Sequence, residues 1–253
     1  MLDIAQNIRN ASLGKSHIFF LGQAGFVFKN EMGRLLGVDL YLSDCVSRYD
    51  GFKRLLPFTI QPGEIEFDYL ITTHAHYDHF DPDSIPELLF NKRTQLFASE
   101  NCSKEIERLQ CSSERIVYVQ RGYKIELDGF KLEFVFCDHG QSAPDAVGVV
   151  IDINGRYVYI TGDTCLRLDM TDRIKRERKF DILIAPVNGT FGNMDESDVL
   201  ELCRVLKPEL LIPCHFGCFA EQWGSLGALS EKISLNMPQQ KYNLMRVGEF
   251  ISI

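Results

Sequence analysis

Short apolar segments alternate with turns along the first quarter of the chain and predict a β-meander. Each segment is rich in Phe, Ile, Leu and Val, and turns that contain glycine separate one from the next. The predicted strands are 17–21, 25–29 and 35–39. The apolar pattern is lost over residues 40–66, which collect charges, Pro57, Pro62 and Gly63 before an apolar run at 67–72. We therefore predict a long loop at 40–66, and long loops in compact domains are often functional.

Helical and strand patterns alternate from residue 80 onward. The predicted helices are 84–90, 103–110, 171–179, 197–206 and 224–235. The predicted strands are 94–99, 115–120, 123–127, 130–136, 147–152, 156–161, 180–185, 210–213 and a last one near 243–252. This mixture of hairpins and βα units fits an α/β fold with two sheets inside and helices outside. No linker or internal repeat divides the chain, so we expect a single domain over residues 1–253.

Composition narrows the class of protein. The chain has 253 residues, 45% of them apolar, and 27 Lys plus Arg against 35 Asp plus Glu give a net charge of −8. This balance argues against a nucleic-acid partner, which requires a basic face, and the basic run 173–179 is interpreted as a solvated helix face. No apolar run approaches the roughly 18 residues of a membrane span. Eight dispersed cysteines and a start without a secretory pattern predict reduced thiols in a cytoplasmic protein.

Three of the six histidines fall within six residues, directly after the apolar run 67–72. The segment reads Thr73-His74-Ala75-His76-Tyr77-Asp78-His79. In an extended segment His74 and His76 project to the same side and reach one metal ion. Asp78 and His79 follow where the chain turns and reach a second ion. A solvent-exposed, histidine-rich loop without ligands is the alternative.

Three further residues follow predicted strands in the same way. They are His139, Asp163 and His215. Taken singly, each histidine is more often an ordinary core or loop residue, and the aspartate a turn or helix-cap residue. Together with the 74–79 segment they complete the seven ligands that a dinuclear metal site uses. Histidine and carboxylate ligands suit two divalent ions, Zn or Mn, with Fe(II) as an alternative.

The order of these residues resembles the pattern of the metallo-β-lactamase-fold hydrolase superfamily, H-x-H-x-D-H followed by a distant His, an Asp and a final His. The resemblance spans residues 17–216. It implies a four-layer αβ/βα sandwich, two mixed sheets flanked by helices, with the site at one edge of the sheets. It also implies the division of the ligands: His74, His76 and His139 on one metal, Asp78, His79 and His215 on the other, and Asp163 bridging both.

Within the superfamily, three segments are similar to the L-ascorbate-6-phosphate lactonase branch. They are Leu21-Gly22-Gln23-Ala24-Gly25-Phe26, Leu56-Pro57-Phe58 through Glu64, and Ile212-Pro213-Cys214-His215-Phe216. The chain differs from the lactonase at Cys214 and Phe216 and looks shorter, which leaves the ascorbate substrate open. Both Cys214 and Cys218 are interpreted as structural rather than as ligands. The resemblance is compatible with a homo-oligomer.

We therefore expect a dinuclear metal-dependent hydrolase whose metal-bridging hydroxide attacks a small, anionic metabolite. A lactone, such as a sugar-acid or ascorbate phosphate lactone, is the leading substrate. A phosphoesterase or phosphodiesterase of the same fold is the alternative, and processing of structured RNA ranks lower because the acidic chain has no evident RNA-binding arm. A metal-binding protein without turnover belongs to a different class, but a structural site would be closed and would not need two ions.

Several residues are candidates for roles other than metal binding. Asp78 or a metal-bound water is expected to relay a proton, and Asp39 either to orient an imidazole or simply to form a turn. The residues expected to contact an anionic substrate are Arg48, Lys53 and Arg54. Simple solvation of a surface loop is the alternative for these three cations. Asn188 begins the loop 188–194, which either lines the substrate entrance or serves as a connector.

Overall fold

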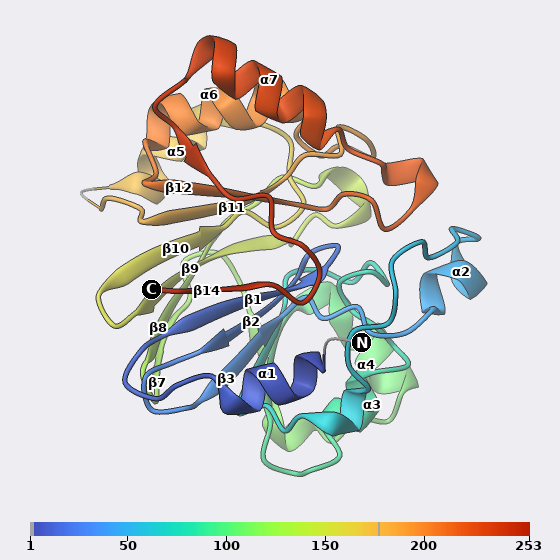
Figure 1. Ribbon diagram of the computed structural model, residues 1–253. Helices are drawn as coiled ribbons and strands as arrows, with labels where there is room; N and C mark the ends of the chain where they lie inside the picture. Colours follow the sequence, from blue (N-terminus) through green and yellow to red (C-terminus); the bar gives the residue numbers. More distant parts are fainter. Residues whose placement is uncertain (1–2, 177) are drawn as a thin grey trace.

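Two mixed β-sheets pack face to face, and helices cover both outer faces of the pair (Figure 1). The computed structural model describes residues 3–176 and 178–253. The four layers are those of the predicted αβ/βα sandwich, and this prediction is confirmed. Glu177, which falls within a predicted helix, lies outside the described residues.

The first sheet is built mainly from the N-terminal half of the chain. Its strands are β1 (His17–Gly22), β2 (Gly25–Lys29), β3 (Leu35–Val38), β4 (Tyr69–Thr72), β5 (Gln95–Ser99), β6 (Ile116–Val119) and β14 (Phe250–Ser252). Their spatial order is β14-β1-β2-β3-β4-β5-β6. The predicted meander is present as β1 to β3, and β3 to β6 run parallel to one another.

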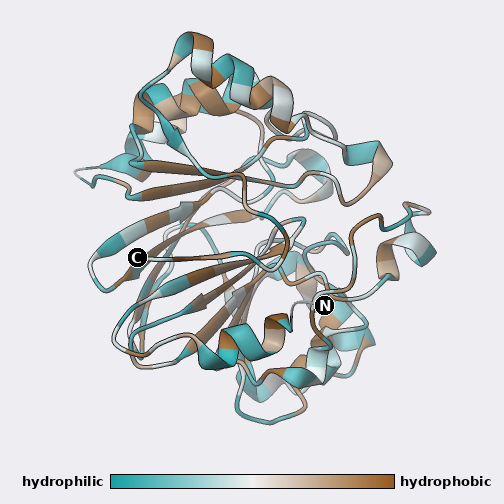
Figure 2. Ribbon diagram, viewed as in Figure 1, coloured by the Kyte–Doolittle hydropathy of each residue, from teal (hydrophilic) through white to brown (hydrophobic). Residues whose placement is uncertain are grey.

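The second sheet is built from the C-terminal half. Its strands are β7 (Lys124–Leu127), β8 (Phe130–Phe136), β9 (Val147–Ile153), β10 (Arg156–Ile160), β11 (Ile182–Pro186), β12 (Leu210–Cys214) and β13 (Lys241–Tyr242). Their order is β13-β12-β11-β10-β9-β8-β7, with β10 to β13 parallel. Apolar side chains of both sheets form one buried cluster between them, which includes Phe20, Ile71, Phe134 and Ile184. This layer buries the inner face of each sheet and the helices bury the outer face, which accounts for the apolar strands in Figure 2.

The helices divide between the two outer faces. Against the first sheet lie α1 (Ile4–Asn10), α3 (Ile85–Leu88) and α4 (Ser103–Arg108), and against the second α5 (Leu168–Lys175), α6 (Glu196–Leu206) and α7 (Leu226–Asn236). The remaining helix is α2 (Cys45–Tyr49). Short 3-10 turns occupy Pro62–Glu64, Glu100–Cys102, Ser113–Arg115, Gly140–Ser142 and Ala220–Gln222. No helix in the described part of the chain is long and apolar enough to cross a membrane.

Local capping explains where several helices begin. The Asp195 carboxylate accepts hydrogen bonds from the amides of Ser197 and Asp198, and this capping box starts α6. Ser225 caps α7 in the same way through the amide of Ala228. Both helices then bury one apolar face on the second sheet.

Several sequence predictions need correction. The prediction of one strand near 243–252 is wrong: Lys241 and Tyr242 pair with β12, whereas Phe250 begins a strand on β1 of the other sheet. The chain crosses between the sheets there, and the amide of Gly248 donates to the carbonyl of Phe20. The predicted helix 171–179 begins at Leu168 and ends at Lys175. The predicted loop 40–66 contains α2, and α1 was not predicted at all.

Asp81 fixes the start of the 40–66 segment beside the histidine cluster. Its fully buried carboxylate accepts hydrogen bonds from the amides of Leu42 and Ser43, at 2.9 and 2.8 Å, and from the hydroxyl groups of Ser43 and Ser84. A buried carboxylate is stable only when such donors surround it. Asp81 stands two residues after His79, so these hydrogen bonds anchor the beginning of the 40–66 segment beside the histidine cluster.

Candidate metal centre

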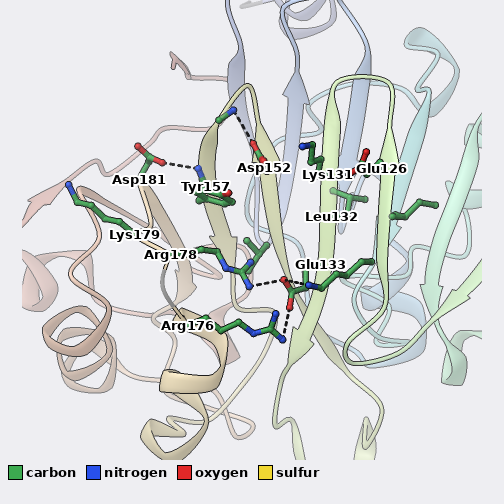
Figure 3. A pocket seen from close by; sticks show the side chains of 14 residues that line it. Glu126, Lys131, Leu132, Glu133, Asp152, Tyr157, Arg176, Arg178, Lys179 and Asp181 are labelled. Carbon is green, nitrogen blue, oxygen red and sulfur yellow. Dashed lines mark hydrogen bonds and ion pairs between the residues drawn. The ribbon is translucent and has the colours of Figure 1, made fainter.

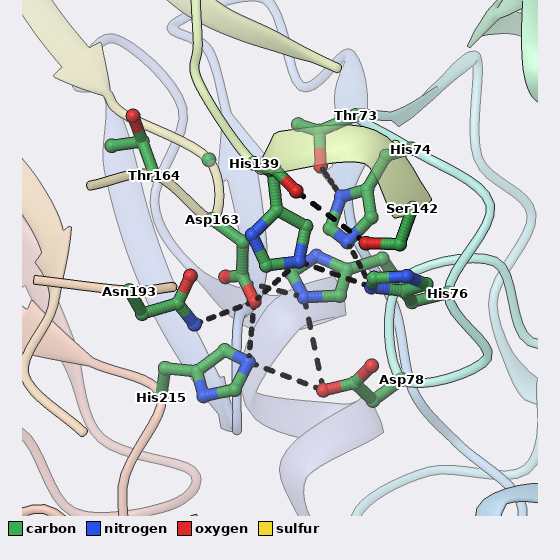
Figure 4. A network of polar contacts seen from close by, with 12 residues as sticks. Thr73, His74, His76, Asp78, His139, Ser142, Asp163, Thr164, Asn193 and His215 are labelled. Atoms are coloured by element: carbon green, nitrogen blue, oxygen red, sulfur yellow. Dashed lines mark hydrogen bonds and ion pairs between the residues drawn. The ribbon is translucent and has the colours of Figure 1, made fainter. Parts of the chain in front are cut away.

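The seven predicted ligands converge at one edge of the two sheets (Figure 4). They follow the carboxyl ends of four strands: β4, β8, β10 and β12. Because these strands point in the same direction within each sheet, their ends lie at a common edge. Residues as far apart in the sequence as His74 and His215 therefore meet in one buried cluster.

Unusual backbone geometry places two of the site residues. His215 has a φ of +59° directly after β12, and its amide donates to the carbonyl of Gln23 at 2.7 Å. Asp163 follows Gly162, which has a φ of +67°; a Cβ at position 162 would lie 2.9 Å from the carbonyl oxygen of Val147. Only glycine fits this turn without displacing β9, so the sequence Gly162-Asp163 is what brings the carboxylate into the site.

The first triad of ligands consists of the imidazoles of His74, His76 and His139. His76 Nδ1 lies 3.0 Å from His74 Nε2 and 3.1 Å from His139 Nε2. Two nitrogens bound to one tetrahedral Zn²⁺ at 2.0–2.1 Å are about 3.4 Å apart, so this triad has nearly the spacing that a single ion requires.

The second triad of ligands combines the carboxylate of Asp78 with the imidazoles of His79 and His215. Asp78 Oδ2 lies 3.2 Å from His215 Nε2 and 3.7 Å from His79 Nε2. His79 Nε2 is buried and has no hydrogen-bond partner among the described residues, although it faces two carboxylates. An unpaired buried ring nitrogen is costly, and a metal ion is the partner that this donor set suits.

Asp163 lies between the two groups. Its Oδ1 is 3.4 Å from His79 Nε2, while its Oδ2 is 3.0 Å from His215 Nε2 and 3.9 Å from His139 Nε2. One carboxylate therefore reaches imidazoles of both triads. The residues present fit the two-metal ligand set that the superfamily resemblance implies.

Asp39 orients one imidazole of each triad, His79 directly and His74 through Thr73. Its Oδ2 lies 2.9 Å from His79 Nδ1 and accepts a hydrogen bond of 2.7 Å from the Thr73 hydroxyl. The same hydroxyl lies 3.0 Å from His74 Nδ1. Since the hydroxyl donates to Asp39, it accepts from His74 Nδ1–H. Asp39 thus places the Nδ1 proton on both rings and leaves both Nε2 atoms free for metal.

Two amides that the sequence did not mark as site residues also touch the cluster. Gln23, in the turn between β1 and β2, donates from Nε2 to Asp78 Oδ2 at 2.8 Å and lies 3.1 Å from His215 Nε2. Asn193 donates to Asp163 Oδ2 at 2.8 Å. A polar residue in an otherwise apolar turn was the one available signal for Gln23; for Asn193 the only signal was its place in the loop 188–194.

Charge in the cluster is balanced between carboxylates and imidazoles. Burial lowers the pKa of His79 and of His215, but Asp163 and Asp78 outweigh this effect; the pKa of His79 rises well above its ordinary value and that of His215 to about 9. Burial lowers the pKa of His74 and brings that of His139 to about 4. Before metal binds, the second triad therefore holds protons at neutral pH and the first does not.

Two of the three cations expected to bind an anionic substrate have other contacts. Arg48 forms an ion pair with Asp83. The Arg54 guanidinium donates to the backbone carbonyls of Tyr41 and Ser43, at 3.1 and 3.0 Å. Lys53 is exposed. Asn188 is buried, and its side-chain amide donates to the Thr190 hydroxyl.

A large cavity lies away from these ligands, on the outer face of β7 to β10 (Figure 3). Its volume is about 1000 Å³. Glu133 projects into it and pairs with Arg176 and Arg178, at 3.2 and 2.7 Å. Lys179 pairs with Glu209 instead. These ion pairs neutralise part of the basic run 173–179.

Comparisons with known proteins agree with this combination of fold and site. The family described as a beta-lactamase superfamily domain matches residues 40–216. A metallo-hydrolase of Ignicoccus hospitalis superposes with a TM-score of 0.74 at 20% identity, over 94% of this chain and 98% of that one. An isothiocyanate hydrolase from Delia radicum gut bacteria superposes with a TM-score of 0.72 at 19% identity, over 94% of this chain and 98% of that one. The class is thus the metallo-β-lactamase superfamily.

Within that superfamily, the chain belongs to the UPF0173 metal-dependent hydrolase family. A member from Saccharolobus solfataricus is 31% identical over 164 residues, which cover 64% of this chain and 71% of the relative. A member from Carboxydothermus hydrogenoformans is 26% identical over 224 residues, covering 85% of this chain and 91% of the relative. The protein is therefore a metal-dependent hydrolase.

Proposed function

We propose that the protein hydrolyses an ester-type bond with two divalent ions, one held by His74, His76 and His139 and the other by Asp78, His79 and His215. The observation that carries this proposal is Asp163, because its two carboxylate oxygens face imidazoles of both triads. A single-metal site would not need a shared carboxylate between two complete triads. Zn or Mn suits this ligand set, with Fe(II) as an alternative.

When bound, such ions supply Lewis acidity and a hydroxide nucleophile at neutral pH. The chain's own residues orient the ligands and move the proton. In the metal-free protein, burial raises the pKa of the Asp78 carboxyl group, but His79 and His215 lower it by more, so the group is ionised. Its Oδ2 is held by Gln23, and its Oδ1 makes no hydrogen bond among the described residues. We assign Asp78 Oδ1 as the atom that accepts a proton from the attacking water.

A lactone is the substrate class we propose. It is supported by the similarity of the segments 21–26 and 212–216 to the lactonase branch and by Gln23, which joins them by contacting His215. Phosphodiesters are the alternative, since two-metal sites serve both reactions. The fold itself does not decide between them, because related folds act on different substrates.

The experiment that tests this function is hydrolysis by the metal-reconstituted protein of a panel of lactones, phosphodiesters and thioesters. We expect the highest kcat/KM on a lactone and loss of that activity on chelation. Preference for a phosphodiester by about tenfold or more would replace the lactone with the alternative. Absence of turnover on the whole panel by fully metallated protein would contradict the proposal.

Metal binding to the second triad is expected to depend on pH. Because the pKa of His215 is raised to about 9 without metal, the ring must release a proton when it coordinates. Affinity for the second ion should therefore rise from about pH 7 toward pH 9. The first triad, whose imidazoles are neutral at neutral pH, should bind with little change over that range.

Calorimetric titration in two buffers of different ionisation enthalpy measures this proton release. At neutral pH the first equivalent of metal should release few protons, and the second about one or more. His215→Ala should reduce the proton release of the second step, because His79, whose pKa is also raised, still loses its proton there. Two steps with the same pH dependence would show that the triads are not distinguished in this way.

A further inference from the structure

Exposed aromatic side chains occur in the segments that contact the metal-binding residues. Trp223 is 60% exposed, Phe191 59% and Tyr49 48%. Together with the partly buried Phe52 and Tyr77 we call these side chains the aromatic rim. Exposure of one large apolar side chain is ordinary, but several next to a catalytic centre indicate a surface that binds an apolar group.

Hydrogen bonds fix Trp223 next to the second triad. Its neighbour Gln222 accepts a hydrogen bond from Gln23 Nε2 at 2.9 Å, and the same nitrogen donates to Asp78. The carbonyl of Trp223 accepts from the amide of Gly217 at 2.9 Å, two residues after His215. The backbone of Trp223 is thus tied to the site while its indole remains exposed.

The other rim residues are tied to the ligands in the same manner. Phe191 stands two residues before Asn193, which donates to Asp163, and its ring centroid is 5.8 Å from that of Phe52. The Tyr49 ring lies 4.5 Å from that of Tyr77, the residue between ligands His76 and Asp78. The 40–66 segment and the loop 188–194 therefore meet beside the metal centre.

Charge in the same segments does not favour an anion. Arg48 and Arg54 are engaged by Asp83 and by backbone carbonyls. Arg108, whose guanidinium lies 5.9 Å from the Tyr49 ring centroid, pairs with Glu105 at 2.6 Å. Lys53 alone among the 40–66 cations has no partner in the described residues.

We propose that the aromatic rim binds an uncharged apolar group, aromatic or alkyl, and that the physiological substrate is an uncharged ester carrying such a group rather than a phosphorylated sugar. This inference rests on the proposed hydrolytic function for the reaction, but it concerns a separate set of side chains. It revises the anionic substrate expected from the sequence, because the arginines of the 40–66 segment serve the fold.

Trp223 is the only tryptophan in the chain and reports on the rim directly. The probes are three lactones with the same five-membered ring: γ-butyrolactone, its γ-phenyl derivative and its γ-carboxylate derivative. Titrated into metal-free protein, the phenyl compound is expected to change the Trp223 fluorescence and to bind at least about tenfold more tightly than the other two. Tighter binding of the carboxylate, or equal affinities, would overturn the inference.

Kinetics of the metallated protein provide the second arm. Phe191→Ala and Trp223→Ala should each raise KM for the phenyl lactone about tenfold with kcat nearly unchanged, and should leave γ-butyrolactone unaffected. Phe90→Ala is the matched control, since Phe90 is 82% exposed and makes no aromatic contact among the described residues. Unchanged KM in both rim variants would overturn the inference.

The two proposals fail in different ways. If the phenyl lactone binds to metal-free protein but no lactone is hydrolysed, the result supports the aromatic rim and contradicts the proposed lactonase reaction. If all three lactones are hydrolysed with equal KM, the reaction stands and the rim does not select the substrate.

Discussion

Asp163→Ala is expected to weaken both metal sites and to lower kcat/KM by roughly 10³-fold or more, since the proposed hydrolysis depends on two ions. The reason is its position: one oxygen faces His79 and the other faces His215 and His139. Loss of the carboxylate should also lower the pKa of His215, which Asp163 raises. Metal content by equilibrium dialysis and elemental analysis measures the first effect.

Two matched variants make the Asp163 result specific. His139→Ala should weaken chiefly one ion, because His139 belongs to the first triad. Asp169→Ala removes a carboxylate whose side chain is 61% exposed and which pairs with Arg167, so it should change neither metal content nor rate. An Asp163→Ala protein with two ions per chain and the wild-type rate would show that Asp163 is not the bridge.

Asp39→Ala is expected to lower the affinity for both ions, each by about 10–100-fold, although Asp39 contacts neither ion itself. The physical reason is the shared carboxylate, which fixes the Nδ1 proton of His79 directly and that of His74 through Thr73. Asp39→Asn should have a similar effect, because its oxygen stays on the Thr73 amide while the –NH2 group in place of Oδ2 cannot accept from Thr73 or His79. Competition with a chromophoric chelator measures both affinities.

A structural defect alone would give a different pattern. Thr73→Val should weaken mainly the ion of the first triad, since it breaks only the path to His74. Asp44→Ala is the control, because Asp44 is exposed and makes no capping hydrogen bond. If Asp39→Ala lost thermal stability but kept both metal affinities, the result would show that Asp39 does not orient the metal ligands.

The sequence predicted the 74–79 ligands because their relation is local. Three histidines and an aspartate follow one apolar strand, so strand geometry alone brings them together. His139, Asp163 and His215 are different: their meeting depends on how β8, β10 and β12 align within a sheet. Pattern and propensity do not encode that alignment. The place of the three residues after predicted strands suggested a shared site, and the superfamily resemblance then implied the division of the ligands.

The missed elements have equally physical causes. Helix α1 buries only Ile4, Ala5 and Ile8, too short a pattern to stand out, although Asp3 caps it through the amide of Gln6. The C-terminal residues were predicted as one strand because apolar residues recur throughout them, whereas the chain leaves the second sheet after β13 and joins the first at β14. Gln23 was not predicted as a site residue, because no sequence pattern reports the direction in which its side-chain amide leaves the turn between β1 and β2.

The number of metal ions that the protein binds tests the dinuclear mechanism most directly. Chelated protein is titrated with Zn²⁺ or Mn²⁺, and bound metal and hydrolytic rate are followed together. Binding should reach two ions per chain, and full activity should appear only as the second ion binds, because the proposed reaction uses both triads and Asp163. Saturation at one ion with full activity, or no uptake by folded protein, would contradict the two-metal mechanism.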